Sequence, residues 1–126
     1  MHIGDTQLLE VLRIGHDTSM RGEGISLRDA LVRARYDDLR QGFGASDLIP
    51  LLQKNHDMLK QWVMYCEDKR ISCGWWISED SFEVGPLESP ESTVRFASLE
   101  QAVSEFVIRE LDFWSGVNKH RTNRSN

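Results

Sequence analysis

Apolar positions in the first third of the chain recur at three- and four-residue intervals, which is typical of amphipathic helices. A first helix is expected to begin with Asp5 as its N-cap and to end near Gly15. A second is expected to begin at Ser26, where Asp29 completes a short capping box, and to end at Gly42. These two stretches predict an N-terminal helical segment.

A third helix is expected after the sequence "GFGA", with Ser46 as its N-cap. Pro50 is compatible with this helix if it lies in the first turn. A short helical turn over residues 57–61 is then expected to lead into a sheet.

From Trp62 the apolar pattern changes to a period of two. The runs "WVMYCE" and "ISCGWWI" are rich in aromatic and β-branched residues, which favour strands. A turn at Lys69 and Arg70 would pair them in antiparallel fashion, with Cys66 opposite Cys73. One face of this predicted hairpin is wholly apolar.

A third predicted strand follows a turn at "SEDS" and joins the same sheet. The expected register pairs Ile77 with Phe82 and Trp75 with Val84, and so extends the apolar face. The opposite face of the predicted sheet carries Val63, Tyr65, Gly74, Trp76 and Glu83.

The sequence "VRF" predicts a short fourth strand with Val94 and Phe96 directed inward. Ser98 is then expected to cap a long C-terminal helix that packs on the apolar sheet face. The helical stripe of this segment consists of Leu99, Ala102, Val103, Phe106, Val107, Glu110, Leu111 and Trp114.

Together these elements predict an α+β fold with an antiparallel sheet of three to four strands, an N-terminal helical segment and a C-terminal helix packed on one face. Residues 1–114 are expected to form a single domain and residues 115–126 a flexible polar tail.

Composition agrees with a folded, soluble protein, with 40% hydrophobic and 28% charged residues among 126. The N-terminus shows no signal peptide or spanning helix, so a cytoplasmic location without membrane association is expected. Cys66 and Cys73 match no zinc or redox spacing and are expected to be thiols.

The chain carries a net charge of −5, which disfavours nonspecific binding to nucleic acid. Residues 79–112 hold nine acidic side chains against two arginines, giving −7 for that segment. This acidic segment could be ordinary solubilising surface, or it could complement a basic partner.

No catalytic or cofactor motif is present in the sequence. The pairs His16-Asp17 and His56-Asp57 resemble the metal-binding pair of phosphohydrolases, whose imidazole and carboxylate suit a divalent ion. Their positions beside turns and helix starts favour chance or capping instead. We therefore expect a non-enzymatic protein without cofactor or metal, and a metal-dependent hydrolase is the less favoured alternative.

Trp76 is the residue that most favours a binding surface, because large aromatic side chains on an exposed sheet face are typical of contact surfaces. The alternative is that the first helices cover this face. The predicted partner-binding residues are Tyr65, Trp76, Glu79, Asp80 and Glu83.

The sequence "QWVMYCEDKRISCGWWI", followed by "AVSEFVIRELDFW", resembles small bacterial immunity and uncharacterised accessory proteins over about residues 60–114. The resemblance implies a twisted sheet flanked by helices and an acidic, aromatic surface that neutralises a toxin, often a basic nuclease. An immunity or inhibitor protein is therefore expected, and a homo-oligomeric scaffold, such as a homodimer, is the main alternative.

Overall fold

The computed structural model describes residues 3–19, 23–69 and 73–115. The elements of the helical N-terminal half are α1 (Asp5–Leu12), α2 (Ile14–Asp17), α3 (Leu27–Arg33), α4 (Tyr36–Leu39), the 3₁₀ helix η1 (Arg40–Gly42), α5 (Ala45–Lys54) and α6 (His56–Asp68). The remaining elements are β1 (Trp75–Ser78), β2 (Glu83–Pro86), the 3₁₀ helix η2 (Pro90–Ser92), β3 (Val94–Arg95) and α7 (Leu99–Trp114).

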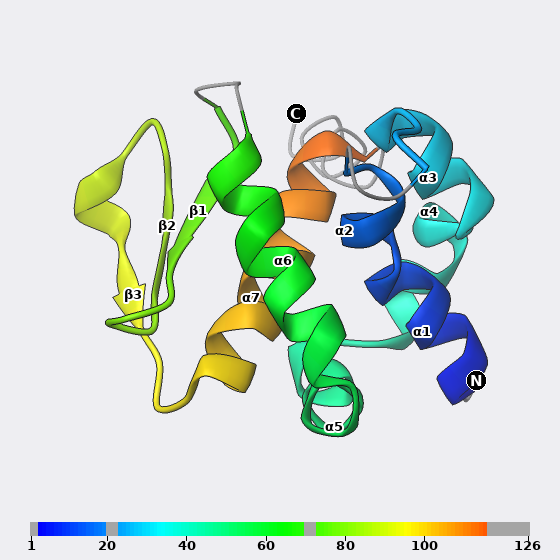
Figure 1. Ribbon diagram of the computed structural model, residues 1–126, viewed down its shortest axis with the longest axis horizontal. Helices are drawn as coiled ribbons and strands as arrows, with labels where there is room; N and C mark the ends of the chain where they lie inside the picture. Colours follow the sequence, from blue (N-terminus) through cyan, green and yellow to red (C-terminus); the bar gives the residue numbers. More distant parts are fainter. Residues whose placement is uncertain (1–2, 20–22, 70–72, 116–126) are drawn as a thin grey trace.

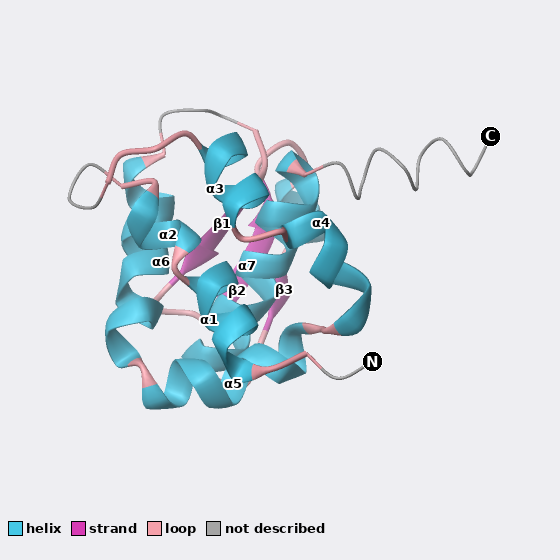
Figure 2. Ribbon diagram, turned by 90° about the vertical axis from the view of Figure 1, so that its right-hand side faces the viewer, coloured by secondary structure: helices cyan, strands magenta, loops and turns pink. Residues whose placement is uncertain are grey.

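Helix α7 lies between the N-terminal helices and the sheet (Figure 1). It packs against α5 and α6 on one side and against β1 and β2 on the other. Figure 2 shows the helices in front of the strands when the molecule is turned by 90°. The core is therefore built around α7, whose fully buried apolar side chains are Ala102, Val103, Phe106, Val107 and Leu111.

The α+β class and an antiparallel sheet are confirmed, with the C-terminal helix on one sheet face. The sheet has three strands in the order β1-β2-β3. Within the described parts of the chain, no helix combines the length and apolar character needed to cross a bilayer.

Two predicted helix caps are confirmed. The Ser26 hydroxyl accepts the backbone N–H of Asp29 at 3.1 Å, and the Ser98 hydroxyl accepts the backbone N–H of Gln101 at 3.2 Å. Both caps depend on contacts within four residues, which is why local sequence predicts them well.

Two other caps were predicted wrongly, because a glycine precedes each helix. Gly4 caps α1 in place of Asp5, and Gly44 caps α5 in place of Ser46. Pro50 consequently lies beyond the first turn of α5.

The first two predicted helices are each divided. Gly15 does not end the first one; it lies inside α2, where a Cβ would approach the Trp62 ring to 2.9 Å. The second is interrupted at Arg35, whose φ of 58° is left-handed. This break turns Tyr36 into the core, where the ring is fully buried.

The predicted strand at residues 62–67 is wrong, because these residues belong to α6. Leu59, Trp62, Val63 and Cys66 are spaced as i, i+3, i+4 and i+7, and the first three are buried on one helix face. The predicted pairing of Cys66 with Cys73 in a hairpin is therefore also wrong. The predicted turn residue Arg70 and the strand start at Ile71 lie outside the described residues, as do residues 116–126 of the predicted tail.

The β1–β2 hairpin forms, but its register differs by two residues from the prediction. Ile77 pairs with Val84 and Trp75 pairs with Pro86, because the turn extends through Phe82, which has a φ of 58°. A shift of two residues leaves each side chain on its predicted face. Val94 in β3 is not inward as predicted but 43% exposed, since it lies on the outermost strand.

Candidate functional site

The outward face of the hairpin carries Trp76, which was predicted to contact a partner. The α-helices lie to the right of the sheet in Figure 1, and the helical segment drawn to its left is the 3₁₀ helix η2. Trp76 pairs with Gly85 across the strands and is partly exposed. The alternative that the first helices cover this face is therefore wrong for the described residues.

Gly85 is buried against the Trp76 ring and the Thr93 side chain. A Cβ on Gly85 would lie 3.1 Å from Trp76 Nε1 and would overlap the Thr93 hydroxyl. The indole and Thr93 thus pack so close to the Gly85 backbone that a larger residue there would require these side chains to shift. This packing holds the Trp76 ring in place while leaving part of it open to solvent.

The predicted acidic residues gather at the turn of the same hairpin. Glu79 and Asp80 are exposed, and Glu83 accepts a hydrogen bond from the Ser81 hydroxyl at 2.6 Å. Arg95 lies opposite Glu83 on β3. Residues 75–97 contain five acidic side chains and one arginine, so this part of the molecule carries a charge of −4.

Tyr65 is not part of this face, because it lies on α6 and not on a strand. Its ring packs against Trp62 and Phe106, at centroid distances of 5.2 and 6.2 Å. Its hydroxyl donates to Glu110 Oε2 at 2.8 Å. The structure therefore places four of the five predicted binding residues on the β1–β2 hairpin and the fifth in a separate cluster.

Glu110 is the centre of that cluster and is fully buried. Its Oε2 atom also forms an ion pair of 2.8 Å with Lys69 Nζ, whose side chain is 10% exposed. Its Oε1 atom accepts the backbone N–H of Trp75 at 2.9 Å. A buried carboxylate needs such partners, because an unpaired charge in the interior is costly.

Side chains of this cluster and of Cys66 form hydrogen bonds with backbone groups on the outer edge of β1. Lys69 Nζ donates to the Trp75 carbonyl at 3.0 Å, and the Cys66 thiol accepts the Ile77 N–H at 3.4 Å. Burial raises the pKa of the Cys66 thiol. Helices α6 and α7 thus supply side chains where a neighbouring strand would otherwise supply backbone groups.

Gly74 packs directly on this cluster. It has a φ of +92°, and a Cβ there would lie 2.6 Å from Glu110 Oε1 and 2.9 Å from Lys69 Nζ. Trp114 Nε1 would be 3.2 Å away and is buried without a hydrogen-bond partner among the described residues. The site therefore requires glycine both for its conformation and for space.

Sequence reasoning placed Glu110 on the apolar stripe of the C-terminal helix but assigned it no role. An acidic residue at a core position of a helix is itself a signal, since acidic side chains are almost never buried unless they are paired. Its partners could not be read from sequence, because Tyr65 and Lys69 had been assigned to a strand and a turn.

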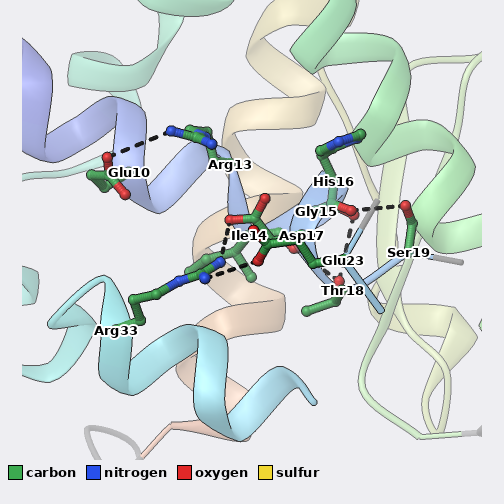
Figure 3. Close-up of polar contacts among 10 residues, drawn as sticks. All are labelled: Glu10, Arg13, Ile14, Gly15, His16, Asp17, Thr18, Ser19, Glu23 and Arg33. Carbon is green, nitrogen blue, oxygen red and sulfur yellow. Dashed lines mark hydrogen bonds and ion pairs between the residues drawn. The ribbon is translucent and has the colours of Figure 1, made fainter. Parts of the chain in front are cut away.

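The two His-Asp pairs do not converge. Asp17 is buried and accepts from Arg33 at 2.7 Å, and Arg33 also binds Glu23 at 2.8 Å. Figure 3 shows the Asp17 carboxylate turned toward Arg33 and the His16 ring pointing away from it.

His16 does line a shallow pocket together with His56 and Asp57. No three histidine, cysteine, aspartate or glutamate side chains in the described ranges are placed to share a metal ion. The convergence that a two-pair metal centre requires is therefore not found among these residues.

No protein-family model, curated protein or solved structure shows a significant match to this chain.

Proposed function

We propose that this chain is a non-enzymatic binding protein whose outward hairpin face engages a basic protein partner, in the manner of an immunity or inhibitor protein. The observation that carries the proposal is the partly exposed Trp76 on the same hairpin as Glu79, Asp80 and Glu83, on a sheet face over which no described α-helix lies.

Trp76 has the properties of a contact anchor. It offers a large apolar ring at little conformational cost, and the Gly85 and Thr93 contacts already restrict its orientation. Aromatic side chains of this kind commonly contribute much of the binding energy of an interface.

The acidic residues supply complementarity to a basic surface. Glu79 and Asp80 are exposed at the hairpin turn, so they can approach a partner without desolvating a core position. Rim charges of this kind mainly accelerate association and depend on salt. The proposed complex should therefore form more slowly as ionic strength rises.

Tyr65 supports this surface from behind. Its hydroxyl binds Glu110, and Glu110 holds the backbone of Trp75, the residue next to Trp76. We assign Tyr65 a positioning role and do not include it among the contact residues.

The test uses native cell extract and two variants, Trp76→Ala and the triple reversal Glu79→Lys, Asp80→Lys and Glu83→Lys. Matched controls are Val32→Ala, an exposed apolar side chain on α3, and the triple reversal of the exposed residues Asp5, Glu10 and Asp37. A basic protein retained by wild type and both controls, but lost with both test variants, supports the proposal.

The captured protein is then purified and its own activity is measured with and without the wild-type chain. An inhibitor role predicts loss of that activity, and Trp76→Ala should not produce it. Unchanged affinity of both test variants, with circular dichroism showing that they are folded, would overturn the proposal.

A further inference from the structure

A separate concave feature lies between the open end of the hairpin and the C-terminal half of α7. It has a volume of about 290 Å³ and is lined by Trp75 and Pro86 from the strands and by Arg109, Asp112 and Phe113 from the helix. Glu88, in the segment after β2, completes the rim. Because Trp75 and Trp76 point to opposite faces of β1, this pocket is distinct from the Trp76 surface.

Aromatic rings form two of its walls. Phe113 is fixed by an edge contact with Trp114 at a centroid distance of 4.9 Å. The Trp75 ring already stacks with one guanidinium. The Cζ atom of Arg109 lies 5.3 Å from the centroid of the Trp75 ring and 5.6 Å from that of Phe96. Aromatic rings of this kind stack well with planar cations such as a guanidinium.

Among the described residues of the lining there are two carboxylates, Glu88 and Asp112, and one cation. The Oδ1 atom of Asp112 accepts hydrogen bonds from the Tyr36 hydroxyl at 2.7 Å and from Arg40 Nε at 2.8 Å. Glu88 is exposed at the rim. Among the described lining residues the one cation is Arg109, which is paired at 3.4 Å with Glu105 on the preceding helical turn.

Aromatic walls and two carboxylates in a concave site suit a guanidinium better than an ammonium ion. A guanidinium is planar, can stack on the rings and can donate two parallel hydrogen bonds to a carboxylate. An anionic ligand would meet the negative charge of Glu88, and an apolar ligand would leave Glu88 without a partner in the complex.

We propose that this pocket receives an arginine side chain of the protein partner. The inference rests on the proposed function for the existence of that partner, and it adds a second anchor beside Trp76. Two contacts define the site. The guanidinium of the arginine stacks on Trp75 or Phe113, and it forms an ion pair with Glu88.

The pocket can be tested without the partner by using N-acetyl-arginine amide as the probe. In spectra of the ¹⁵N-labelled chain, the indole N–H resonance of Trp75 should shift saturably. The indole of Trp62, which is buried and bonded to the Leu12 carbonyl, should not shift. The uncharged norleucine analogue should cause no saturable shift.

Glu88→Gln should weaken probe binding about three-fold, because it removes one partly solvated ion pair. Glu91→Gln is the matched control, since Glu91 is a nearby exposed acid outside the pocket lining and should leave affinity unchanged. Equal weakening by both variants, absence of a Trp75 shift, or preferential binding of N-acetyl-glutamate amide would each overturn the pocket proposal.

The two proposals fail separately. If Trp76→Ala abolishes capture of the partner while the arginine probe leaves Trp75 unshifted, the pocket proposal is overturned and the proposed function stands. If the probe binds but the captured partner is indifferent to Trp76→Ala and to the charge reversal, the proposed function is overturned instead. The role of the pocket as a partner anchor is then overturned with it.

Discussion

The backbone N–H of Trp75 donates to a carboxylate oxygen of Glu110, 35 residues away in sequence, at 2.9 Å. The same carboxylate binds Lys69 and Tyr65 through its other oxygen. One fully buried acid thus joins β1, α6 and α7, and the orientation of the hairpin on the helices depends on it.

Glu110→Gln should lower the free energy of unfolding by about 3 kcal/mol, because it leaves the Lys69 charge buried without its counter-ion. Urea unfolding measures this. Glu105→Gln, which removes a partly exposed partner of Arg109 on the same helix, should cost less than about 1 kcal/mol.

Adding Lys69→Met to Glu110→Gln should recover part of the loss, since the unpaired charge is then gone. Equal effects of Glu110→Gln and Glu105→Gln would show that the buried ion pair does not have the importance assigned to it.

Gly74→Ala should destabilise the fold more than Gly24→Ala. Both glycines have positive φ, +92° and +64°, but only Gly74 faces crowded atoms. The strained backbone alone should cost about 1–2 kcal/mol at Gly24. Displacement of Glu110 should add at least about 1 kcal/mol at Gly74. Thermal or urea unfolding of the two variants gives the difference, and equal losses would contradict the crowding.

The two tyrosines should not ionise near their ordinary pKa of 10.0 while the protein is folded. Burial, and then the neighbouring carboxylates Asp112 and Glu110, raise the pKa values of Tyr36 and Tyr65 respectively. The folded state therefore keeps protons that the unfolded chain releases above about pH 10. Stability should be unaffected by these groups below that pH and should fall as the pH rises beyond it.

Ultraviolet absorbance of tyrosinate and circular dichroism, followed together in an alkaline titration, test this expectation. The two signals should change in one transition. Tyr65→Phe should reduce the alkaline loss of stability. A tyrosinate signal near pH 10 with an intact dichroism spectrum would contradict the burial of these hydroxyls.

Cys66 should react slowly with iodoacetamide at neutral pH. Its thiol is partly buried, accepts the Ile77 N–H and has a raised pKa, so little thiolate is available. A Cys73→Ser background isolates the reaction, and mass spectrometry follows it in buffer and in urea. A rate in buffer equal to the rate in urea would contradict the predicted protection.

Local signals predicted the fold where local contacts determine it. The Ser26 and Ser98 caps follow from residues within one turn. The strand assignment for residues 62–67 failed because aromatic and β-branched residues suggested a period of two. Including Met58 and Leu59 in the same window reveals helical spacing, which burial in α6 confirms.

The candidate site was predictable in part for the same reason. The faces of Trp76 and Glu83 survived a two-residue error in register, because side chains alternate along a strand. The position of Tyr65 did not survive, because it depended on the wrong element. The Glu110 cluster joins residues from three elements, and no local pattern specifies that meeting.

The side chains along the outer edge of β1 also limit how copies of this chain can assemble. Glu110, Lys69 and Cys66 bond the N–H and carbonyl of Trp75 and the N–H of Ile77, so these three backbone groups are not available to an added strand. The opposite border is β3, which is only two residues long. Continuous sheets running from one molecule to the next are therefore disfavoured, and any symmetric dimer must join through faces of the molecule and not through its strands.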